Sequence, residues 1–299
     1  MEWTDQLERL EFLRGKTMTV NPLSGGLTNT NLRVTTDDGL DIVVRCSDPG
    51  SEALDIDRDA EYENTRAAAA AGVGAAVVGR TVEPRMLAIE FLAGRALDDS
   101  DFGDAEVMRR AALAVRTLHA GPRFVNDFDM FARRSRYLAT IAENGYRLPE
   151  GYLGYADQWE SVRQALASSA PATVPCNNDL LAANFIDDGE RVWLIDYEYS
   201  GNNDACFELG NTATECGFSQ DQIDAWAEAY FGNPSQAQRA RVRLQALVSC
   251  YGWSLWGFIQ SAVSPIDYDF WSWGMERYEK AQATFGSAGF QGLLEDVAA

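Results

Sequence analysis

The sequence predicts an α+β protein with two lobes, a small antiparallel β-rich lobe in residues 1–92 and a larger, mostly helical lobe in residues 93–299. Most of the first lobe consists of short apolar segments separated by tight turns, with a single strongly helical segment among them. Beyond Gly94 the apolar residues recur at the spacing of a helix instead. The length of 299 residues supports this division, because single hydrophobic cores usually stop growing near that size.

The small lobe is expected to contain one short amphipathic helix in residues 2–14, followed by short strands. Leu32 and Val34 alternate with polar residues, and the turn Asp37-Asp38-Gly39 separates their strand from the next. An arginine, Arg45, ends that next strand, which is otherwise apolar. The strands are predicted at residues 17–23, 31–36, 41–46, 76–79 and 86–91.

Helices are predicted from propensity, periodicity and capping signals. The main helix of the small lobe spans residues 57–71, and Gly72 is placed to end it. Residues 92–95 are typical of a linker, and a β-hairpin is expected at 184–195. Ser219 and Ser235 each begin a capping box. The helices of the large lobe are predicted at residues 107–118, 159–168, 220–231, 236–262 and 270–283.

The composition favours some partners over others. The chain has 45 acidic and 25 basic residues, a net charge of −20, which disfavours nucleic acid and anionic membranes and suits small cationic molecules. General solubility or salt tolerance would explain this charge equally well. The N-terminal residues lack a signal-peptide pattern, and no apolar run is long enough to cross a bilayer. We therefore expect a cytoplasmic protein without membrane insertion, as a monomer or homodimer.

A glycine turn between two predicted strands is a candidate phosphate-binding loop. Glycines allow backbone N–H groups to wrap a phosphate, and polar side chains beside them add donors. An ordinary Gly-Gly hairpin turn is the commoner explanation of such a segment. The candidate residues are Ser24, Gly25, Gly26, Thr28 and Asn29.

A cation and a carboxylate in the same lobe form a second candidate feature. Arg45 at the end of a strand and Glu61 on the following helix could pair and direct the arginine toward nucleotide phosphates. Glu63 lies two residues further on and must face elsewhere on the helix, so only one of the two glutamates can be the partner. Unrelated surface residues would explain the two charges if they stood alone.

The segment from 175 to 199 carries the most specific pattern. Asp179 is followed by Asn184 five residues later, and Asp196 follows the second strand of the predicted hairpin. Asp179 would accept the proton of an attacking hydroxyl, and Asn184 and Asp196 would hold Mg²⁺ on the phosphates. A polar loop with Asx turns is the alternative.

Together these motifs resemble the aminoglycoside phosphotransferase and choline kinase group. The resemblance rests on G-G-L-T-N-T-N, N-x-D-x-x-x-x-N and I-D-Y-E-Y in this order, and on W-G-F-I-Q-S-A-V-S-P-I-D-Y-D-F near the C-terminus. It implies a protein-kinase-like fold, with a nucleotide-binding lobe in residues 1–92 and the substrate pocket in 93–299. It also implies ATP and Mg²⁺, with Asp179 as the base and Asn184, Asp196 and Glu198 at the metal.

The same resemblance assigns further residues. Arg45 and Glu61 match the nucleotide-orienting pair, and Glu90 to Leu92 match the segment that faces the adenine. One position departs from the pattern, because Asn177 stands where the group usually has a histidine. Asparagine can still donate and accept hydrogen bonds, although with shorter reach and without titration.

The aromatic residues near the C-terminus suggest a site for a cationic head group. Aromatic faces attract ammonium groups, an interaction of up to about 2 kcal/mol when desolvated, although a helical core would also use such rings. We predict that Trp256, Tyr268 and Trp273 contact the substrate. The predicted activity is ATP-dependent phosphorylation of choline or ethanolamine. Another small-alcohol or aminoglycoside phosphotransferase, and a nucleotide-binding pseudokinase, are the alternatives.

Overall fold

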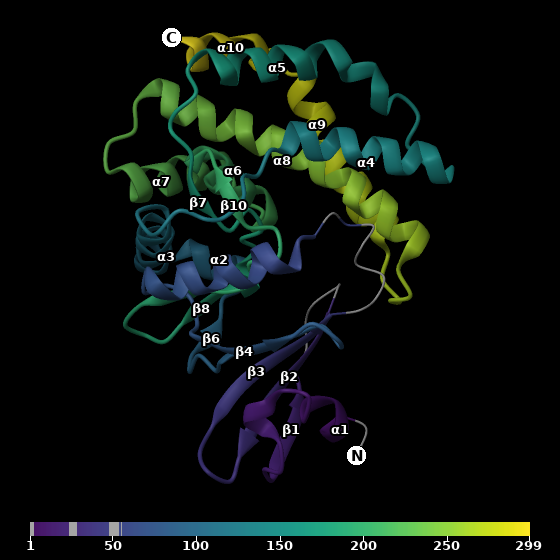
Figure 1. The fold of residues 1–299 in the computed structure, drawn as a ribbon. Helices are drawn as coiled ribbons and strands as arrows, with labels where there is room; N and C mark the ends of the chain where they lie inside the picture. The colour runs from purple at the N-terminus through teal and green to yellow at the C-terminus, as the bar shows by residue number, and fades with distance from the viewer. Residues whose placement is uncertain (1–2, 24–28, 48–53, 55) are drawn as a thin grey trace.

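The structure is a computed structural model, and it describes residues 3–23, 29–47, 54 and 56–299. Its small lobe is built on an antiparallel sheet, which occupies the lower part of Figure 1. The order of the described strands is β1-β2-β3-β5-β4. They are β1 (Met18–Pro22), β2 (Asn29–Thr36), β3 (Asp41–Ser47), β4 (Val77–Thr81) and β5 (Met86–Glu90).

One face of this sheet is buried because its apolar residues alternate along the strands. Leu32 and Val34 of β2 and Ile42 and Val44 of β3 are fully buried. The predicted helix over 2–14 is wrong: the chain forms a short helix α1 (Thr4–Leu7) and a 3-10 turn η1 (Glu11–Leu13). Leu10 between them has an extended backbone, and Leu7, Leu10 and Leu13 are all buried with the sheet.

Helix α2 (Arg58–Ala70) belongs to the small lobe by sequence but is anchored in the large lobe. Asp57 caps it by accepting hydrogen bonds from two backbone N–H groups. Ala68 lies in a hydrophobic cluster made mainly of large-lobe residues. Asn64 is fully buried and donates to Asn126 at 2.7 Å and to the Ser200 hydroxyl at 3.0 Å. The helix is therefore held by apolar packing and by buried hydrogen bonds at once.

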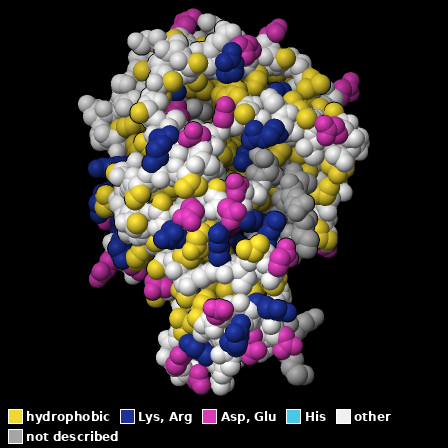
Figure 2. Space-filling model, in the orientation of Figure 1, with side chains coloured by type: hydrophobic (Ala, Val, Ile, Leu, Met, Phe, Trp, Pro, Cys, Tyr) yellow, Lys and Arg dark blue, Asp and Glu magenta, His cyan; other side chains and the backbone are white. Residues whose placement is uncertain are grey.

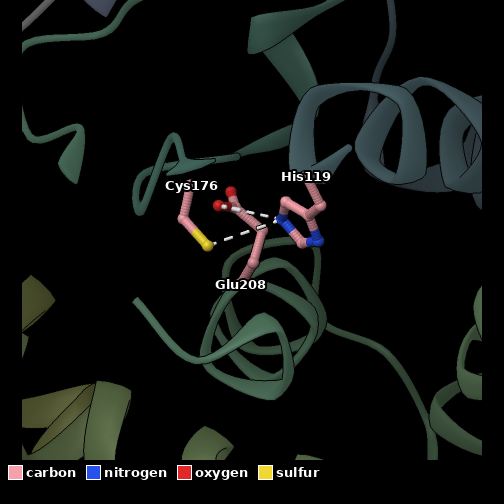
Figure 3. Close-up of side chains that lie close together, drawn as sticks. All are labelled: His119, Cys176 and Glu208. Atoms are coloured by element: carbon pink, nitrogen blue, oxygen red, sulfur yellow. Dashed lines mark hydrogen bonds and ion pairs between the residues drawn. The ribbon is translucent and has the colours of Figure 1, made fainter. Parts of the chain in front are cut away.

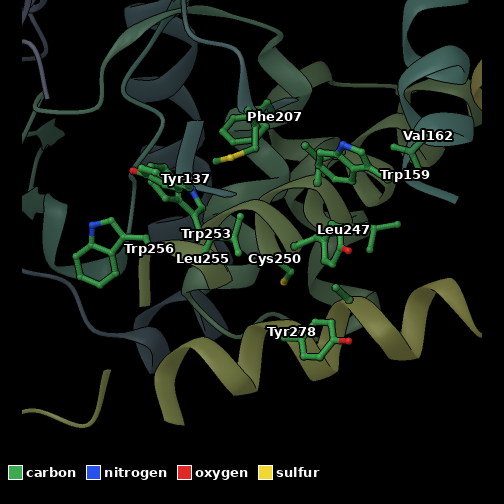
Figure 4. Packing of buried hydrophobic residues seen from close by; sticks show 14 of the residues in the cluster. Tyr137, Trp159, Val162, Phe207, Leu247, Cys250, Trp253, Leu255, Trp256 and Tyr278 are labelled. Carbon is green, nitrogen blue, oxygen red and sulfur yellow. The ribbon is translucent and has the colours of Figure 1, made fainter. Parts of the chain in front are cut away.

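The large lobe is organised around its longest described helix, α8 (Gln236–Val263), which contacts helices on several sides. Trp253, Leu255 and Trp256 of α8 lie in one core with Tyr137, Phe207 and Tyr278 (Figure 4). The other helices are α3 (Ala105–His119), α4 (Met130–Asn144), α5 (Ala156–Ser168), α6 (Ala205–Glu215), α7 (Gln220–Phe231), α9 (Phe270–Phe285) and α10 (Phe290–Ala298). Short 3-10 segments are η3 (Asp99–Gly103), η4 (Tyr152–Tyr155) and η5 (Ala182–Asn184).

Short strands complete the large lobe and carry the central segment. The predicted hairpin is present as β8 (Phe185–Asp187) and β9 (Val192–Leu194), with β6 (Arg95–Ala96) paired to β8. A second small sheet joins β7 (Val174–Cys176) to β10 (Gly201–Asn203). These strands fix both ends of the segment on which the predicted site residues lie.

Three helices of the large lobe, α4, α6 and α10, are absent from the sequence prediction. In α4 the buried face includes Arg133 and Arg134, whose guanidiniums stack on aromatic rings, so the apolar period is masked. In α6 the buried face includes Glu208 and Asn211. Both capping boxes, at Ser219 and Ser235, are confirmed.

The distribution of surface charge and the apolar content of the helices can be compared with the partners expected from the sequence. On the face that Figure 2 shows, acidic side chains are scattered among arginines and lysines over both lobes. The net charge is therefore spread and does not form one patch on that face. Among the described residues, none of the helices combines the length and the apolar content needed to cross a bilayer.

The contact between α6 and α8 depends on a glycine and can be tested. A Cβ on Gly210 would lie 2.5 Å from the Ala246 nitrogen and 2.7 Å from the Val242 oxygen, both backbone atoms. Gly210→Ala should therefore reduce the free energy of unfolding by at least about 1–3 kcal/mol, measured by urea denaturation. Gly292→Ala in α10, where a Cβ meets nothing within 4 Å, is the control and should gain about 0.5–1 kcal/mol. Wild-type stability of Gly210→Ala would contradict this packing.

Candidate active site

A cavity of about 890 Å³ lies between the two lobes and collects most of the predicted site residues. Its small-lobe wall is lined by Leu23, Asn29, Asn31, Val43, Arg45, Leu87 and Ile89. Glu90 at the end of β5, and Phe91, Leu92 and Gly94 after it, also line the cavity. The large lobe contributes, among others, Asp179, Asn184, Asp196, Glu198, Trp256, Tyr268 and Trp273. Of the predicted residues that are described, Glu61 does not line this cavity and reaches it through Arg45.

The loop after β7 holds Asp179 and Asn184 together. The Asn184 side-chain amide donates to the Asp179 backbone oxygen at 2.8 Å, which closes the loop on itself. The Ile195 N–H donates to the Asn184 carbonyl at 3.0 Å and thereby ties the loop to the segment after β9. Asp196 follows directly, so the two segments present their polar side chains to the same cavity.

Asn177 makes the hydrogen bonds that join these two segments from below. It is fully buried, and its amide nitrogen donates to the Asp196 carbonyl at 2.7 Å and to the Ile195 carbonyl at 3.0 Å. Its side-chain oxygen accepts from the Asp179 N–H at 3.0 Å. Asp196 has a left-handed backbone with φ of 65°, which these contacts help to hold. The asparagine therefore uses both its donor and its acceptor.

Asp179 is a carboxyl group in a strongly perturbed environment. Burial raises its pKa well above the ordinary range, and the carboxylates of Glu215, Asp196 and Glu198 raise it further. Arg277 acts in the opposite direction and lowers it. A carboxylate with raised proton affinity in a cleft is suited to accept a proton from a hydroxyl.

An ion-pair network connects the sheet, α2 and the segment after β9. Arg45 lies 2.7 Å from Glu61 and 2.6 Å from Asp196, and its guanidinium is 3.7 Å from Glu198. The alternative partner Glu63 instead pairs with Arg66 at the surface. Burial alone would lower the pKa of Arg45, but the three carboxylates together raise it above its usual value. The arginine thus remains a cation inside the cleft.

A second arginine, Arg58, belongs to the same network and is absent from the sequence prediction. It contacts Glu61 at 2.8 Å and Glu198 at 3.1 Å, and it donates to the Asn29 side-chain oxygen at 3.1 Å. Asn29 in turn donates to Glu198 at 2.9 Å. The helical spacing of Arg58 and Glu61 is a signal that sequence reasoning could have used. The other members of the predicted glycine turn, Ser24, Gly25, Gly26 and Thr28, lie outside the described residues.

The donor set around Asp196 suits a hard divalent cation. Asp196 and Glu198 offer carboxylate oxygens, and Asn184 offers an amide oxygen, the ligand types that Mg²⁺ takes. The amide nitrogen of Asn184 is engaged with the Asp179 carbonyl, so its oxygen is the side-chain atom left to accept or coordinate among the described contacts. Burial, followed by Asp196, raises the pKa of Glu198, and Arg45 and Arg58 act in the opposite direction. The residues therefore fit a magnesium ion.

Aromatic residues of the large lobe form part of the cavity wall. Trp256 and Trp273 have ring centroids 5.0 Å apart, and the Trp256 N–H donates to the Tyr199 hydroxyl at 2.9 Å. Tyr268 lines the same wall but is 46% exposed, so it lies at the entrance. The Arg277 guanidinium lies 3.3 Å from the centre of the Trp273 ring.

Carboxylates that the sequence did not single out accompany these rings. Asp98, Asp99 and Glu215 line the cavity, and Glu215 forms a bidentate ion pair with Arg277. Burial, then Asp98 and Glu215, raise the pKa of Asp99. Glu215 and Arg277 are far apart in the chain, so only the packing of α6 against the α8–α9 unit reveals the pair.

The family of the chain follows from comparison with known proteins. A family model described as the phosphotransferase enzyme family matches residues 19–245. The chain belongs to this family. A choline/ethanolamine kinase family protein from Mesorhizobium loti has 31% sequence identity and a TM-score of 0.86, and the match covers 99% of this chain and 98% of that chain. The predicted resemblance is therefore confirmed, and membership makes the chain a phosphotransferase.

More distant relatives agree with this membership. Ethanolamine kinase 1 of Mus musculus is 25% identical over 303 residues, which covers 88% of this chain and 83% of that protein. The choline kinase LicA from Streptococcus pneumoniae has 22% identity and a TM-score of 0.74, covering 97% of this chain and 98% of that chain. A GDP complex of aminoglycoside 2'-phosphotransferase-IIIa has 15% identity and a TM-score of 0.66, covering 94% and 98%. These two structures share the fold, which confirms the predicted two-lobed class.

In this phosphotransferase a buried polar cluster, whose members do not line the cavity, supports the loop after β7. His119, Cys176 and Glu208 converge from α3, β7 and α6 (Figure 3). The Asn178 N–H donates to both carboxylate oxygens of Glu208 at 3.2 Å, and the His119 ring bonds the Tyr230 hydroxyl at 2.7 Å. Burial, together with Glu208, raises the pKa of the Cys176 thiol. The single histidine therefore has a structural place at the end of α3, away from the cavity.

The bridging contacts of Asn177 give a first test of the site. Asn177→Asp keeps the shape but replaces the amide donor with an oxygen that faces two carbonyl groups. We expect a loss of about 2–4 kcal/mol in the free energy of unfolding, because a buried carboxylate loses both acceptor partners. Chemical denaturation measures this loss. The exposed Asn233→Asp is the control, and equal stability of the two variants would show that the bridge is unimportant.

Proposed function

We propose that this phosphotransferase transfers the γ-phosphate of ATP, with Mg²⁺, to the hydroxyl of a small cationic alcohol, choline or ethanolamine. One observation carries the proposal. Asp179 lines a single cavity together with oxygen ligands suited to Mg²⁺ and with aromatic rings and further carboxylates. A hydroxyl and a cationic head group are the two chemical features that such a cavity can bind at once.

At the reacting end, each residue has a separate role. Asp179 accepts the proton of the alcohol hydroxyl while the alcohol oxygen attacks the γ-phosphorus and ADP leaves. Asn184, Asp196 and Glu198 would hold Mg²⁺, which when bound neutralises charge on the phosphates. Arg45, kept charged by Glu61 and Asp196, orients the phosphates. Catalysis then depends mainly on positioning and electrostatics.

At the nucleotide end, the proposal of ATP rests on the shape and polarity of the wall. Val43, Leu87 and Ile89 give an apolar surface, and Glu90 and Leu92, which the resemblance assigns to the adenine-facing segment, line the same cavity. A structural relative is known in complex with AMP and another with GDP, which supports a nucleotide in this cleft. Phosphate contacts from Ser24, Gly25, Gly26, Thr28 and Asn29 stay a prediction.

For the head group, the aromatic rings and the carboxylates of the cavity wall both suit an ammonium ion. Trp256 and Tyr268 provide ring faces, as does the side of Trp273 that Arg277 does not cover. Asp99 provides negative charge, whereas the charge of Glu215 is paired with Arg277. The names of the relatives, ethanolamine kinases and choline kinases, support an amino alcohol of this size. A cytoplasmic location and a monomeric or homodimeric state stay predictions.

A substrate panel tests the acceptor and the base together. Purified enzyme with ATP and Mg²⁺ should release ADP with choline or ethanolamine, and Asp179→Asn should lower kcat about 10²–10⁴-fold because the base is lost. Asp157→Asn, at an exposed position of α5, should retain wild-type rates. Turnover with aminoglycosides alone would move the acceptor assignment. ADP release with none of these alcohols despite nucleotide binding would favour a pseudokinase.

The metal can be tested separately. Removal of Mg²⁺ with EDTA should stop turnover, and added Mg²⁺ should restore it. Asp196→Asn should raise the Mg²⁺ concentration for half-maximal rate by at least about tenfold, because a ligand carboxylate is lost. Full activity in EDTA would contradict a metal-dependent transfer.

A further inference from the structure

Arg58 contacts three segments of the chain at the lobe junction. One of its terminal nitrogens lies 2.8 Å from Glu61 and 3.1 Å from Glu198, and the other donates to Asn29 at 3.1 Å. These partners come from α2, from the segment after β9 and from the first residue of β2. The Arg58 side chain is only 12% exposed, so these contacts are largely shielded from water.

The base of Arg58 is rigid. It is the first residue of α2, directly after the capping residue Asp57. The helix is fixed to the large lobe through Asn64, which is fully buried and bonded to Asn126 and Ser200. The guanidinium therefore projects from a fixed helix end toward the site.

Among the described contacts, Arg58 is the nearer of two cations to Glu198. Arg58 lies 3.1 Å from the Glu198 carboxylate, whereas Arg45 lies 3.7 Å from it. Arg45 is engaged more closely with Asp196 at 2.6 Å. Glu61 joins the two arginines, because each of its oxygens contacts one of them. In the segment after β9, Arg45 thus contacts mainly Asp196, and Arg58 contacts mainly Glu198.

We propose that Arg58 is a positioning residue for the magnesium site, which holds Glu198 and Asn29 in register with Asp196. This inference rests on the proposed function, in which Asp196 and Glu198 bind the metal. Without Arg58, the carboxylates of Glu198, Asp196 and Glu61 would share one guanidinium, and their repulsion would displace Glu198. Metal-dependent nucleotide binding would weaken, while nucleotide contacts that need no metal would persist.

The planar fork of arginine is needed for this role. A guanidinium presents several donors in fixed directions, so it can contact Glu61, Glu198 and Asn29 at the same time. A lysine keeps the charge on a single nitrogen and cannot span all three partners. Comparison of arginine with lysine at position 58 therefore separates the effect of charge from the effect of geometry.

Calorimetric binding of a non-hydrolysable ATP analogue, AMP-PNP, tests the proposal without turnover. Wild type, Arg58→Met, Arg58→Lys and Arg66→Met are compared with excess Mg²⁺ and with EDTA. Arg66 lies on the same helix, is exposed and pairs with Glu63, so Arg66→Met is the matched control. Arg58→Met should lose about tenfold of the affinity gained from Mg²⁺, while its affinity in EDTA should change less than about twofold. Arg58→Lys should fall between Arg58→Met and wild type.

The outcomes distinguish this inference from the proposed function. If Mg²⁺ does not strengthen wild-type binding, the proposed metal role itself fails. If wild type shows the Mg²⁺ effect and Arg58→Met keeps it, the inference alone is overturned. Equal losses in Mg²⁺ and EDTA would also overturn it, because they indicate a general structural role. Thermal unfolding of each variant checks folding, and Mn²⁺ binding followed by electron paramagnetic resonance gives a direct measure of the metal site if Arg58→Met is less stable.

Discussion

The structure depends on the ion pairs between Glu61 and the two arginines at the lobe junction. Buried charges cost several kcal/mol each unless partners compensate them, and removal of either arginine would leave the carboxylates of this network to share the one that remains. Glu61 contacts Arg45 with one oxygen and Arg58 with the other, and the arginines extend to Asp196 and Glu198. These ion pairs thereby fix the sheet, helix α2 and the segment after β9 relative to one another.

The position of α2 makes this junction rigid on one side. Its buried face packs into the core of the large lobe, although its sequence lies between strands of the small lobe. The helix therefore carries Glu61 and Arg58 as fixed features of the large lobe, while Arg45 arrives on β3. The sheet of this phosphotransferase is linked to the large lobe through the guanidinium of Arg45, which pairs with Asp196, and through Asn29, which contacts Arg58 and Glu198.

Beneath the cleft, hydrogen bonds to backbone atoms hold the loop after β7. Asn177 joins the loop to the Asp196 segment, and Asn178, which also has a left-handed backbone, donates its N–H to Glu208. The resemblance implies a histidine at position 177, and the asparagine here donates to the Ile195 carbonyl and accepts from the Asp179 N–H. The departure changes the residue and retains the connection between the two segments.

The sequence by itself determined the fold class, most element positions and part of the set of polar residues that line the cavity. It could do so because alternation, capping and short motif spacings are local properties of the chain. Only the tertiary structure decided that α2 packs with the large lobe, that Arg58 joins the site and that Glu215 pairs with Arg277. These facts depend on contacts between distant segments and on buried charges, and α4, with buried arginines on its inner face, escaped prediction for the same reason. Local sequence patterns identify many of the site residues, and tertiary packing determines which residues they contact.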